Sequence, residues 1–319
     1  MSKFLTIGEP IALFGSDEQD KSLEEAQKFT KYLAGAEVNV AVGVSRLGHS
    51  TQYVTRLGDD PFGGFIEKEL SKNNIGTDYI EKTDAFWTAY QLKNRVSEGD
   101  PDIYYFRKGS AASHINEDIL SEIDWSEIEF VHLSGIFPAI SSESLSAFNR
   151  LIEMIKQNQI TSTFDPNLRP QLWNSEEEMR ETINDLAKHA DIILPGISEG
   201  KILVGSEDPE VIADFYLKQS EITSTVIVKL GEAGAYIKQK GNTVGMTIAG
   251  QRVEQVVDTV GAGDGFAVGV ITGLLEGIDI KSAVARGNII GALAVQSSGD
   301  NDGYPDRAKL DAIEKEYES

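Results

Sequence analysis

The sequence predicts an α/β protein in which helices flank a mostly parallel central sheet and a small β-sheet lid is added. Two observations support this prediction. Short strand-like runs alternate with helical patterns over most of the 319 residues, as expected for repeated βα units and a sheet covered on both faces. Residues 86–107 break that alternation, because two strand-like runs follow each other there without a helix.

The strands expected in the central sheet are short, rich in β-branched residues, and end at Gly, Asp or Pro. They cover residues 3–8, 51–58, 129–135, 160–165, 190–195 and 224–231. Helical patterns lie between these runs at residues 61–74, 141–158 and 175–190. The last two begin with a serine and an acidic first turn, which is the usual start of a helix.

The lid is expected from two strands around a turn at residues 97–102. An antiparallel insertion of this kind can cover a site. We expect the lid to consist of parts of residues 9–35 and 86–112. The sequence has no internal repeat or Pro-rich linker, so a single domain over residues 1–319 is expected.

Composition excludes several classes of function. The 51 acidic residues outnumber the 29 basic ones, giving a formal charge of −22, so nucleic acid and anionic membranes are poor partners. No segment approaches the roughly 20 apolar residues that cross a bilayer. The apolar stretch at the N-terminus is too short for a secretory signal. The absence of cysteine excludes thiolate metal sites and cysteine nucleophiles. A cytoplasmic location is the default expectation.

The segment "DTVGAGDGF", residues 258–266, carries the strongest chemical signal. We expect an extended apolar stretch, a loop of Gly261, Ala262 and Gly263, and a helix from about Asp264. Glycines let backbone N–H groups approach an anion, and a helix N-terminus adds partial positive charge. The segment therefore predicts an anion hole suited to phosphate.

Asp264 inside this anion hole needs an explanation, because a carboxylate repels phosphate. A base that takes the proton of an attacking hydroxyl must stand beside the phosphoryl group. The alternative is that Asp264 only caps the helix above a tight glycine turn. A P-loop and a dinucleotide fingerprint are both weak alternatives, since no lysine follows the glycines and residues 283–287 read "AVARG" where the fingerprint needs an acid.

Two segments resemble the signatures of one enzyme family. "DTVGAGDGFAVGVI" is similar to the C-terminal signature of the ribokinase-like (phosphofructokinase B type) carbohydrate kinases, and "AGAEVNVAVGVSRLG" to their N-terminal signature. The segments "YYFRKGSAA", "FDPNLRPQLW" and "GDNDGYP" further resemble the 2-keto-3-deoxygluconate kinases of that family. The resemblance implies a ribokinase-like fold with a Rossmann-like sheet and a β lid. It also implies transfer of the γ-phosphoryl group of ATP to a hydroxyl of this sugar acid, with Asp264 as catalytic base.

The resemblance also implies cofactors and binding residues. ATP and Mg²⁺ are the expected cofactors, a monovalent cation is left open, and the chain is expected to form a homo-oligomer. The residues implied for the sugar acid are Gly35, Asn39, Tyr90, Tyr105, Arg107, Arg169 and Asp300. Those implied for ATP are Asn167, Gly231, Gly234, Gly261, Gly263 and Asn288.

Two of these assignments have a physical argument beside the resemblance. A sugar acid is repelled at long range by a protein of charge −22, so local arginines must attract it, and Arg107 and Arg169 suit a carboxylate. For the metal, the N-x-x-E pattern of the family reads Gly196-Ile197-Ser198-Glu199 here. Only Glu199 is therefore carried over, and how Mg²⁺ is held stays open.

Three other functions remain as alternatives. The same fold could phosphorylate a neutral sugar such as fructose, tagatose or ribose, which would leave both arginines without a carboxylate to bind. A non-catalytic sugar or nucleotide sensor would not need the base Asp264. A Rossmann dehydrogenase ranks third, and it would bind NAD.

Overall fold

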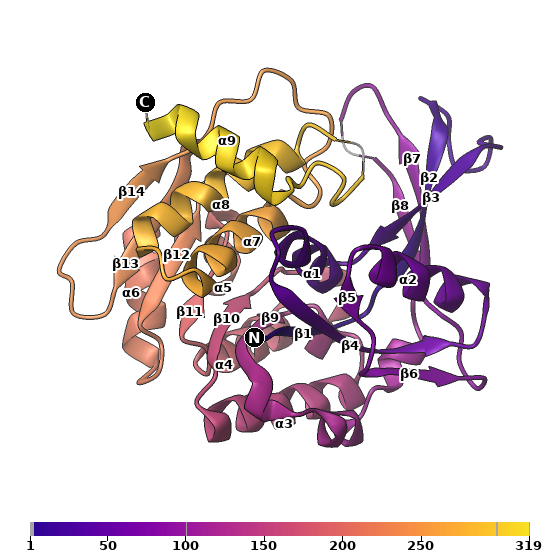
Figure 1. Cartoon of the computed structure of the whole chain (residues 1–319), viewed down its shortest axis with the longest axis horizontal. Helices are drawn as coiled ribbons and strands as arrows, with labels where there is room; N and C mark the ends of the chain where they lie inside the picture. The colour runs from indigo at the N-terminus through magenta and orange to yellow at the C-terminus, as the bar shows by residue number, and fades with distance from the viewer. Residues whose placement is uncertain (1–2, 100, 298, 319) are drawn as a thin grey trace.

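A computed structural model of the chain describes residues 3–99, 101–297 and 299–318. Across these residues, ten strands form one central sheet with the order β14-β13-β12-β11-β10-β9-β1-β4-β5, in which β6 also pairs with β4 (Figure 1). The pairs from β5 to β12 are parallel, whereas β13 and β14 are antiparallel additions at one edge. The strands are β1 (Lys3–Ile7), β4 (Ser50–Gly58), β5 (Ile75–Gly76), β6 (Ile80–Thr83), β9 (Ile128–Ser134), β10 (Thr161–Asp165), β11 (Ile192–Ile193), β12 (Thr225–Lys229), β13 (Gly234–Gln239) and β14 (Met246–Ala249).

Helices cover both faces of this sheet, so its strands are buried on both sides. Neighbouring residues such as Phe4 and Leu5, or Phe130 and Val131, are all less than 4% exposed and belong to two different hydrophobic clusters. One cluster packs under α3 (Ser142–Asn158), α4 (Glu176–Ala187), α5 (Ile197–Leu203) and α6 (Pro209–Gln219). The other packs under α1 (Ala36–Arg46), α2 (Pro61–Lys72), α7 (Ala262–Leu275), α8 (Ile280–Ala294) and α9 (Arg307–Glu318).

A second, four-stranded sheet forms the lid beside α1 and α2 (Figure 1). Its order is β3 (Phe29–Ala34), β2 (Ile11–Gln19), β7 (Tyr90–Arg95) and β8 (Ile103–Phe106). The β7–β8 hairpin is antiparallel, while β2 and β7 pair in parallel. The four strands come from the two stretches in which the sequence predicts a lid.

The expected fold class is confirmed, and most expected elements begin and end within two or three residues of the observed ones. Ser141 and Ser175 cap α3 and α4 through their side chains, as predicted. The extended stretch expected before Gly261 does not pair into a strand, because residues 251–260 form no strand there. Helix α7 also begins at Ala262 rather than Asp264, since Gly261 takes a left-handed φ of 82° and caps the helix.

Within the described residues, no helix combines the length and apolarity needed to cross a membrane.

Candidate active site

Two adjoining pockets open near the carboxyl ends of the parallel strands, where ligands bind in α/β sheets. We call the first the lid pocket, of about 820 Å³, because Gln91, Lys93 and Tyr105 of the lid line it. We call the second the hairpin pocket, of about 790 Å³, because the turn between β12 and β13 lines it. The pockets share residues of that turn and of the glycine loop: Lys229, Gly231, Thr259 and Gly263.

Asp264 lies in the first turn of α7 and lines the lid pocket. Its two carboxylate oxygens accept hydrogen bonds from the side-chain amides of Asn39, at 2.9 Å, and Asn167, at 3.4 Å. Asn301 donates to the amide oxygen of Asn39 at 2.8 Å, which fixes the orientation of that amide. Because Gly261 caps the helix and Asp264 is held by two side chains, the simple capping role does not fit.

The environment of Asp264 suits a base. Burial raises its pKa from 3.8 to about 6, and the nearby charge of Asp165 raises it as well. The hydrogen bond from Asn39 and the positive charges of Arg169 and Lys229 oppose this rise. A carboxyl with a pKa of about 6 is ionised at neutral pH and binds a proton more readily than an exposed aspartate.

The glycine loop leaves backbone donors available beside Asp264. The N–H groups of Gly263 and Asp264 lie in the first turn of α7, where no carbonyl of the same helix can accept them, whereas the N–H of Ala262 donates to the carbonyl of Thr259 at 3.4 Å. A Cβ atom at Gly261 would lie 1.9 Å from the carbonyl oxygen of Asp300, so only glycine fits this position. Gly261 lines the lid pocket, Ala262 the hairpin pocket, and Gly263 both.

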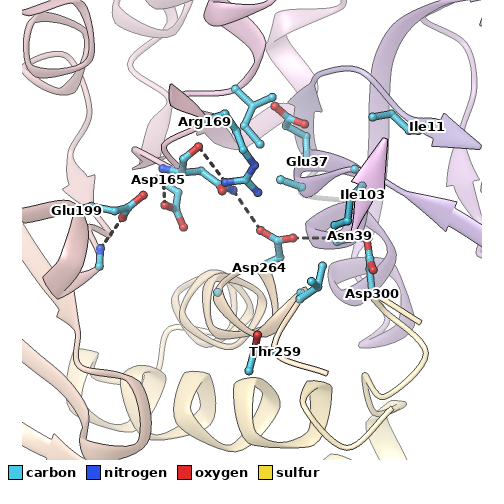
Figure 2. A pocket seen from close by; sticks show the side chains of 18 of the residues that line it. Ile11, Glu37, Asn39, Ile103, Asp165, Arg169, Glu199, Thr259, Asp264 and Asp300 are labelled. Atoms are coloured by element: carbon cyan, nitrogen blue, oxygen red, sulfur yellow. Dashed lines mark hydrogen bonds between the residues drawn. The ribbon is translucent and has the colours of Figure 1, made fainter. Parts of the chain in front are cut away.

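The two predicted arginines both line the lid pocket but have different surroundings. Arg107 donates from Nε to Glu9 at 2.6 Å, and both side chains are nearly buried, at 11% and 1% exposure. Arg169 donates only to the backbone carbonyls of Leu168 and Asn167 among the described residues. Its positive charge is therefore not paired with a carboxylate there, and Figure 2 shows its guanidinium directed into the same cavity as Asp264.

Two of the other carboxyl groups that line the lid pocket have an unpartnered oxygen, and the sequence identified only one of these two. Asp300 and Glu37 are 6% and 1% exposed, and each has one oxygen without a hydrogen-bond partner among the described residues (Figure 2). Burial raises the pKa of Asp300 to about 6 and that of Glu37 to about 7. Glu37 was missed, although an acid in the first turn of an otherwise apolar helix is a signal that could have identified it.

The structure does not bring Tyr90 to either pocket. Its ring stacks on Phe106 at 4.6 Å and contacts Phe62, which places it on the opposite face of the lid sheet. The next residue of β7, Gln91, lines the lid pocket instead, because successive side chains of a strand point to opposite faces. Tyr105 of β8 does line the pocket, together with Gly35 and Asn39.

The residues predicted for ATP divide between the two pockets. Gly231, Gly234 and Asn288 line the hairpin pocket, and Asn288 donates to the carbonyls of Ile248 and Ala249. Residues 225–239 form the β12–β13 hairpin around this glycine turn. Asn167 instead lies in the lid pocket beside Asp264.

The acidic residues near the pocket junction are occupied by other hydrogen-bond donors, so the protein can hold Mg²⁺ only indirectly. Both oxygens of Glu199 accept backbone N–H groups, from Gly196 at 2.6 Å and Leu168 at 2.8 Å. Asp165 accepts from Lys229. Among the described residues, no three acidic or histidine side chains converge as a metal cluster. This donor set fits an ion that is held mainly by phosphate oxygens and keeps its water shell, as Mg²⁺ usually does.

An ion pair connects the lid to the glycine loop. The ammonium of Lys93, on β7, donates to the carboxylate of Asp258, at the start of the "DTVGAGDGF" segment. Both side chains are largely buried, at 8% and 16% exposure. The lid strand that lines the pocket is thereby tied to the segment that carries the anion hole.

A carboxylate base beside a helix N-terminus, between two pockets, defines a phosphotransferase site. Comparison with known proteins agrees with this class. The chain matches the model of the pfkB family carbohydrate kinases over residues 1–307. It therefore belongs to the pfkB family of carbohydrate kinases, which phosphorylate an alcohol group, and the resemblance found in the sequence is confirmed.

The chain is also similar to individual members of this family and to solved structures. A 2-dehydro-3-deoxygluconokinase from Bacillus subtilis (strain 168) is 46% identical over 307 residues, which cover 96% of this chain and 93% of the relative. The crystal structure of a PfkB protein from Polaromonas sp. JS666 is 40% identical, with a TM-score of 0.87 and coverage of 98% and 100% of the two chains. The crystal structure of an uncharacterized sugar kinase from Pyrococcus horikoshii in complex with ATP is 28% identical, with a TM-score of 0.80 and 96% coverage of each chain.

Proposed function

We propose that the protein transfers the γ-phosphoryl group of ATP to a hydroxyl of 2-keto-3-deoxygluconate, also called 2-dehydro-3-deoxygluconate. The observation that carries this proposal is that Arg169 and Asp264 line the same pocket without forming an ion pair with each other. A guanidinium without a carboxylate partner suits an acidic substrate, and a base beside the glycine loop suits phosphoryl transfer. The name of the Bacillus subtilis relative supports the same substrate.

The two pockets then have separate roles. The lid pocket takes the sugar acid, with its carboxylate toward Arg169 and toward the terminal nitrogens of Arg107, whose Nε is engaged by Glu9. Asn39, Gly35, Tyr105 and Asp300 line this pocket and are proposed to contact the rest of the sugar. The hairpin pocket takes ATP, with its phosphates directed toward Gly263 at the junction.

The chemistry follows from the position of Asp264. The substrate hydroxyl oxygen bonds to the γ-phosphorus while the bond from that phosphorus to the bridging oxygen of ADP breaks. Asp264 accepts the hydroxyl proton, and the N–H groups of Gly263 and Asp264 in the first turn of α7 hydrogen-bond to the phosphoryl oxygens. Mg²⁺, when bound with ATP, neutralises phosphate charge. We propose that Glu199 acts on it indirectly, by holding the backbone at Gly196 and Leu168.

The test is a coupled assay of ADP release with ATP, Mg²⁺ and a panel of 2-keto-3-deoxygluconate, fructose, tagatose and ribose. We expect the sugar acid to have the highest kcat/KM. A neutral sugar as the best acceptor would replace the substrate but keep the enzyme class. Absence of any acceptor-dependent ADP release would favour a sensor. The same assay, with potassium replaced by choline, measures whether a monovalent cation is needed.

We also propose that the protein self-associates through the outer face of the lid and acts in the cytoplasm, where its ATP is supplied. Tyr104 and Phe106 are 63% and 44% exposed on the face opposite the lid pocket, and Trp87 is 52% exposed. Exposed aromatic groups of this kind are enriched in interfaces. Sedimentation velocity of the wild type and of Tyr104→Ser tests this. A monomeric wild type would contradict it.

A further inference from the structure

Lys229 is a largely buried lysine at the junction of the two pockets, and it forms the last residue of β12. Its side chain is 17% exposed. It lines both the lid pocket and the hairpin pocket, as do Gly231, Thr259 and Gly263. Lys229 is the member of this set that carries a charge. Any group that passes from one pocket to the other passes this ammonium.

The ammonium of Lys229 has more hydrogen-bond donors than it has side-chain partners among the described residues. It donates to Asp165, whose side chain is 3% exposed. A lysine ammonium has three N–H donors, and Asp165 is its one side-chain partner among the described residues. The carboxylates of Asp165, Glu199 and Asp264 raise its pKa against the opposing effect of burial, so it stays charged.

The ammonium also lies beside the anion hole. A Cβ atom placed on Gly263 would lie 3.5 Å from Nζ of Lys229. Gly263 is in the first turn of α7, where the backbone N–H groups have no partner within the helix. One phosphoryl oxygen can therefore be reached from both the loop and the lysine.

We propose that Lys229 is a catalytic residue whose ammonium contacts the phosphoryl group during its transfer from the hairpin pocket to the lid pocket. This inference rests on the proposed kinase function and adds a residue to it. The carboxylates of Asp165 and Glu199 are occupied by Lys229 and by backbone N–H groups. The lysine thus supplies a fixed positive charge where the transferred group gathers negative charge.

The competing explanation is that Lys229 only neutralises Asp165 and holds the loop that follows β10. The two roles differ in what they predict for nucleotides. Contact with the transferred group requires a γ-phosphoryl, so the lysine should affect binding of a non-hydrolysable ATP analogue but not of ADP. A lysine that only supports the loop should affect both nucleotides alike, or neither.

The experiment measures binding of AMP-PNP and ADP, each with Mg²⁺, by calorimetry on the wild type and on Lys229→Met. We expect Lys229→Met to weaken AMP-PNP binding roughly 10- to 150-fold, the equivalent of one hydrogen bond to a charged group, and ADP binding less than about threefold. We also expect kcat for the sugar acid to fall roughly 10²–10³-fold, as for loss of one oxyanion donor. Lys229→Arg should restore part of kcat because it keeps the charge.

Two further variants serve as controls. Lys201→Met, on the exposed surface of α5, should leave both affinities unchanged, since that lysine is 66% exposed. If Lys229→Met is unstable because Asp165 is left unpaired, the same comparison is made between Asp165→Asn and the double variant Asp165→Asn/Lys229→Met. Equal changes for AMP-PNP and ADP, or no change, would overturn the role of Lys229. A wild type that binds neither nucleotide would instead overturn the proposed kinase function and this inference with it.

Discussion

Asp264 illustrates what the sequence reveals about a single residue and what it does not. Its place in a glycine loop before an apolar helix predicts a base in an anion hole. Its hydrogen-bond partners could not be predicted, because Asn39 lies 225 positions away in the sequence and Asn167 lies 97 away. Lys229 and Glu37 were missed for a related reason. Each ends or begins an apolar element and becomes a pocket residue only through tertiary packing.

We expect Asp264→Asn to lower kcat roughly 10²–10⁴-fold, the contribution of a positioned general base. The affinity for ATP should change much less, because the amide keeps the shape of the carboxyl. Steady-state kinetics and nucleotide binding on the purified variant check this. A kcat near that of the wild type would show that Asp264 is not the base.

The same substitution should stabilise the fold at neutral pH. Since folding raises the pKa of Asp264 from 3.8 to about 6, the folded state binds the proton more tightly, and stability falls as pH rises between these values. A neutral side chain avoids this cost, so Asp264→Asn should gain about 1–3 kcal/mol at pH 7. Urea unfolding at pH 4 and pH 7 measures it. A gain of the same size at both pH values would contradict the explanation.

The pH dependence of activity should follow the same carboxyl. Below a pH of about 6 Asp264 is protonated and cannot accept the hydroxyl proton, so log(kcat/KM) should fall with a slope near 1. The residual activity of Asp264→Asn should lack this limb. A limb that persists in the variant would belong to another pocket carboxyl, such as Asp300 or Glu37.

At the scale of elements, the hydrophobic pattern predicts where the strands lie in the sequence, but a side chain can still be assigned to the wrong face of a strand. Strands such as β4 and β12 lie where β-branched runs predict them, because these runs are long enough to be buried on both faces. β11 shortens to two residues, and residues 251–260, directly before the glycine loop, contain no strand. In the lid, the family resemblance implied Tyr90 for the sugar acid, whereas its neighbour Gln91 lines the lid pocket, because successive side chains of a strand point to opposite faces.

The lid is held to the body by buried pairs that join distant segments. Arg107 follows β8, whereas its partner Glu9 follows β1, 98 positions earlier. We expect Arg107→Ala to lose about 3–5 kcal/mol of stability, the usual cost of leaving one member of a buried pair uncompensated. Arg169→Ala is the matched control and should lose much less, because no carboxylate pairs with it among the described residues. Thermal unfolding of both variants measures this. Equal losses of stability would show that burial of the Glu9 carboxylate does not depend on its ion pair with Arg107.

At the scale of the whole molecule, the net charge opposes binding of the acidic substrate that we propose for the site. The chain carries a formal charge of −22, which repels an acidic substrate at a distance. The lid pocket overcomes this locally, because Arg107 and Arg169 reach it from the lid hairpin and from the loop after β10. The sequence identified both arginines through a family resemblance. Their unequal surroundings became clear only from the fold, which brings Glu9 to one of them.

The central claim is that the lid pocket binds a sugar acid through Arg169, and one comparison tests it most directly. It measures kcat/KM for 2-keto-3-deoxygluconate and for a neutral ketose on the wild type and on Arg169→Ala. One hydrogen bond to a charged group is worth about 1.5–3 kcal/mol, so we predict a roughly 10- to 150-fold loss for the acid and a far smaller loss for the ketose. Arg169→Lys should restore the acid only in part, since it lacks the planar fork. Equal losses for both sugars would mean that Arg169 serves ATP or the fold, and would contradict the sugar-acid assignment.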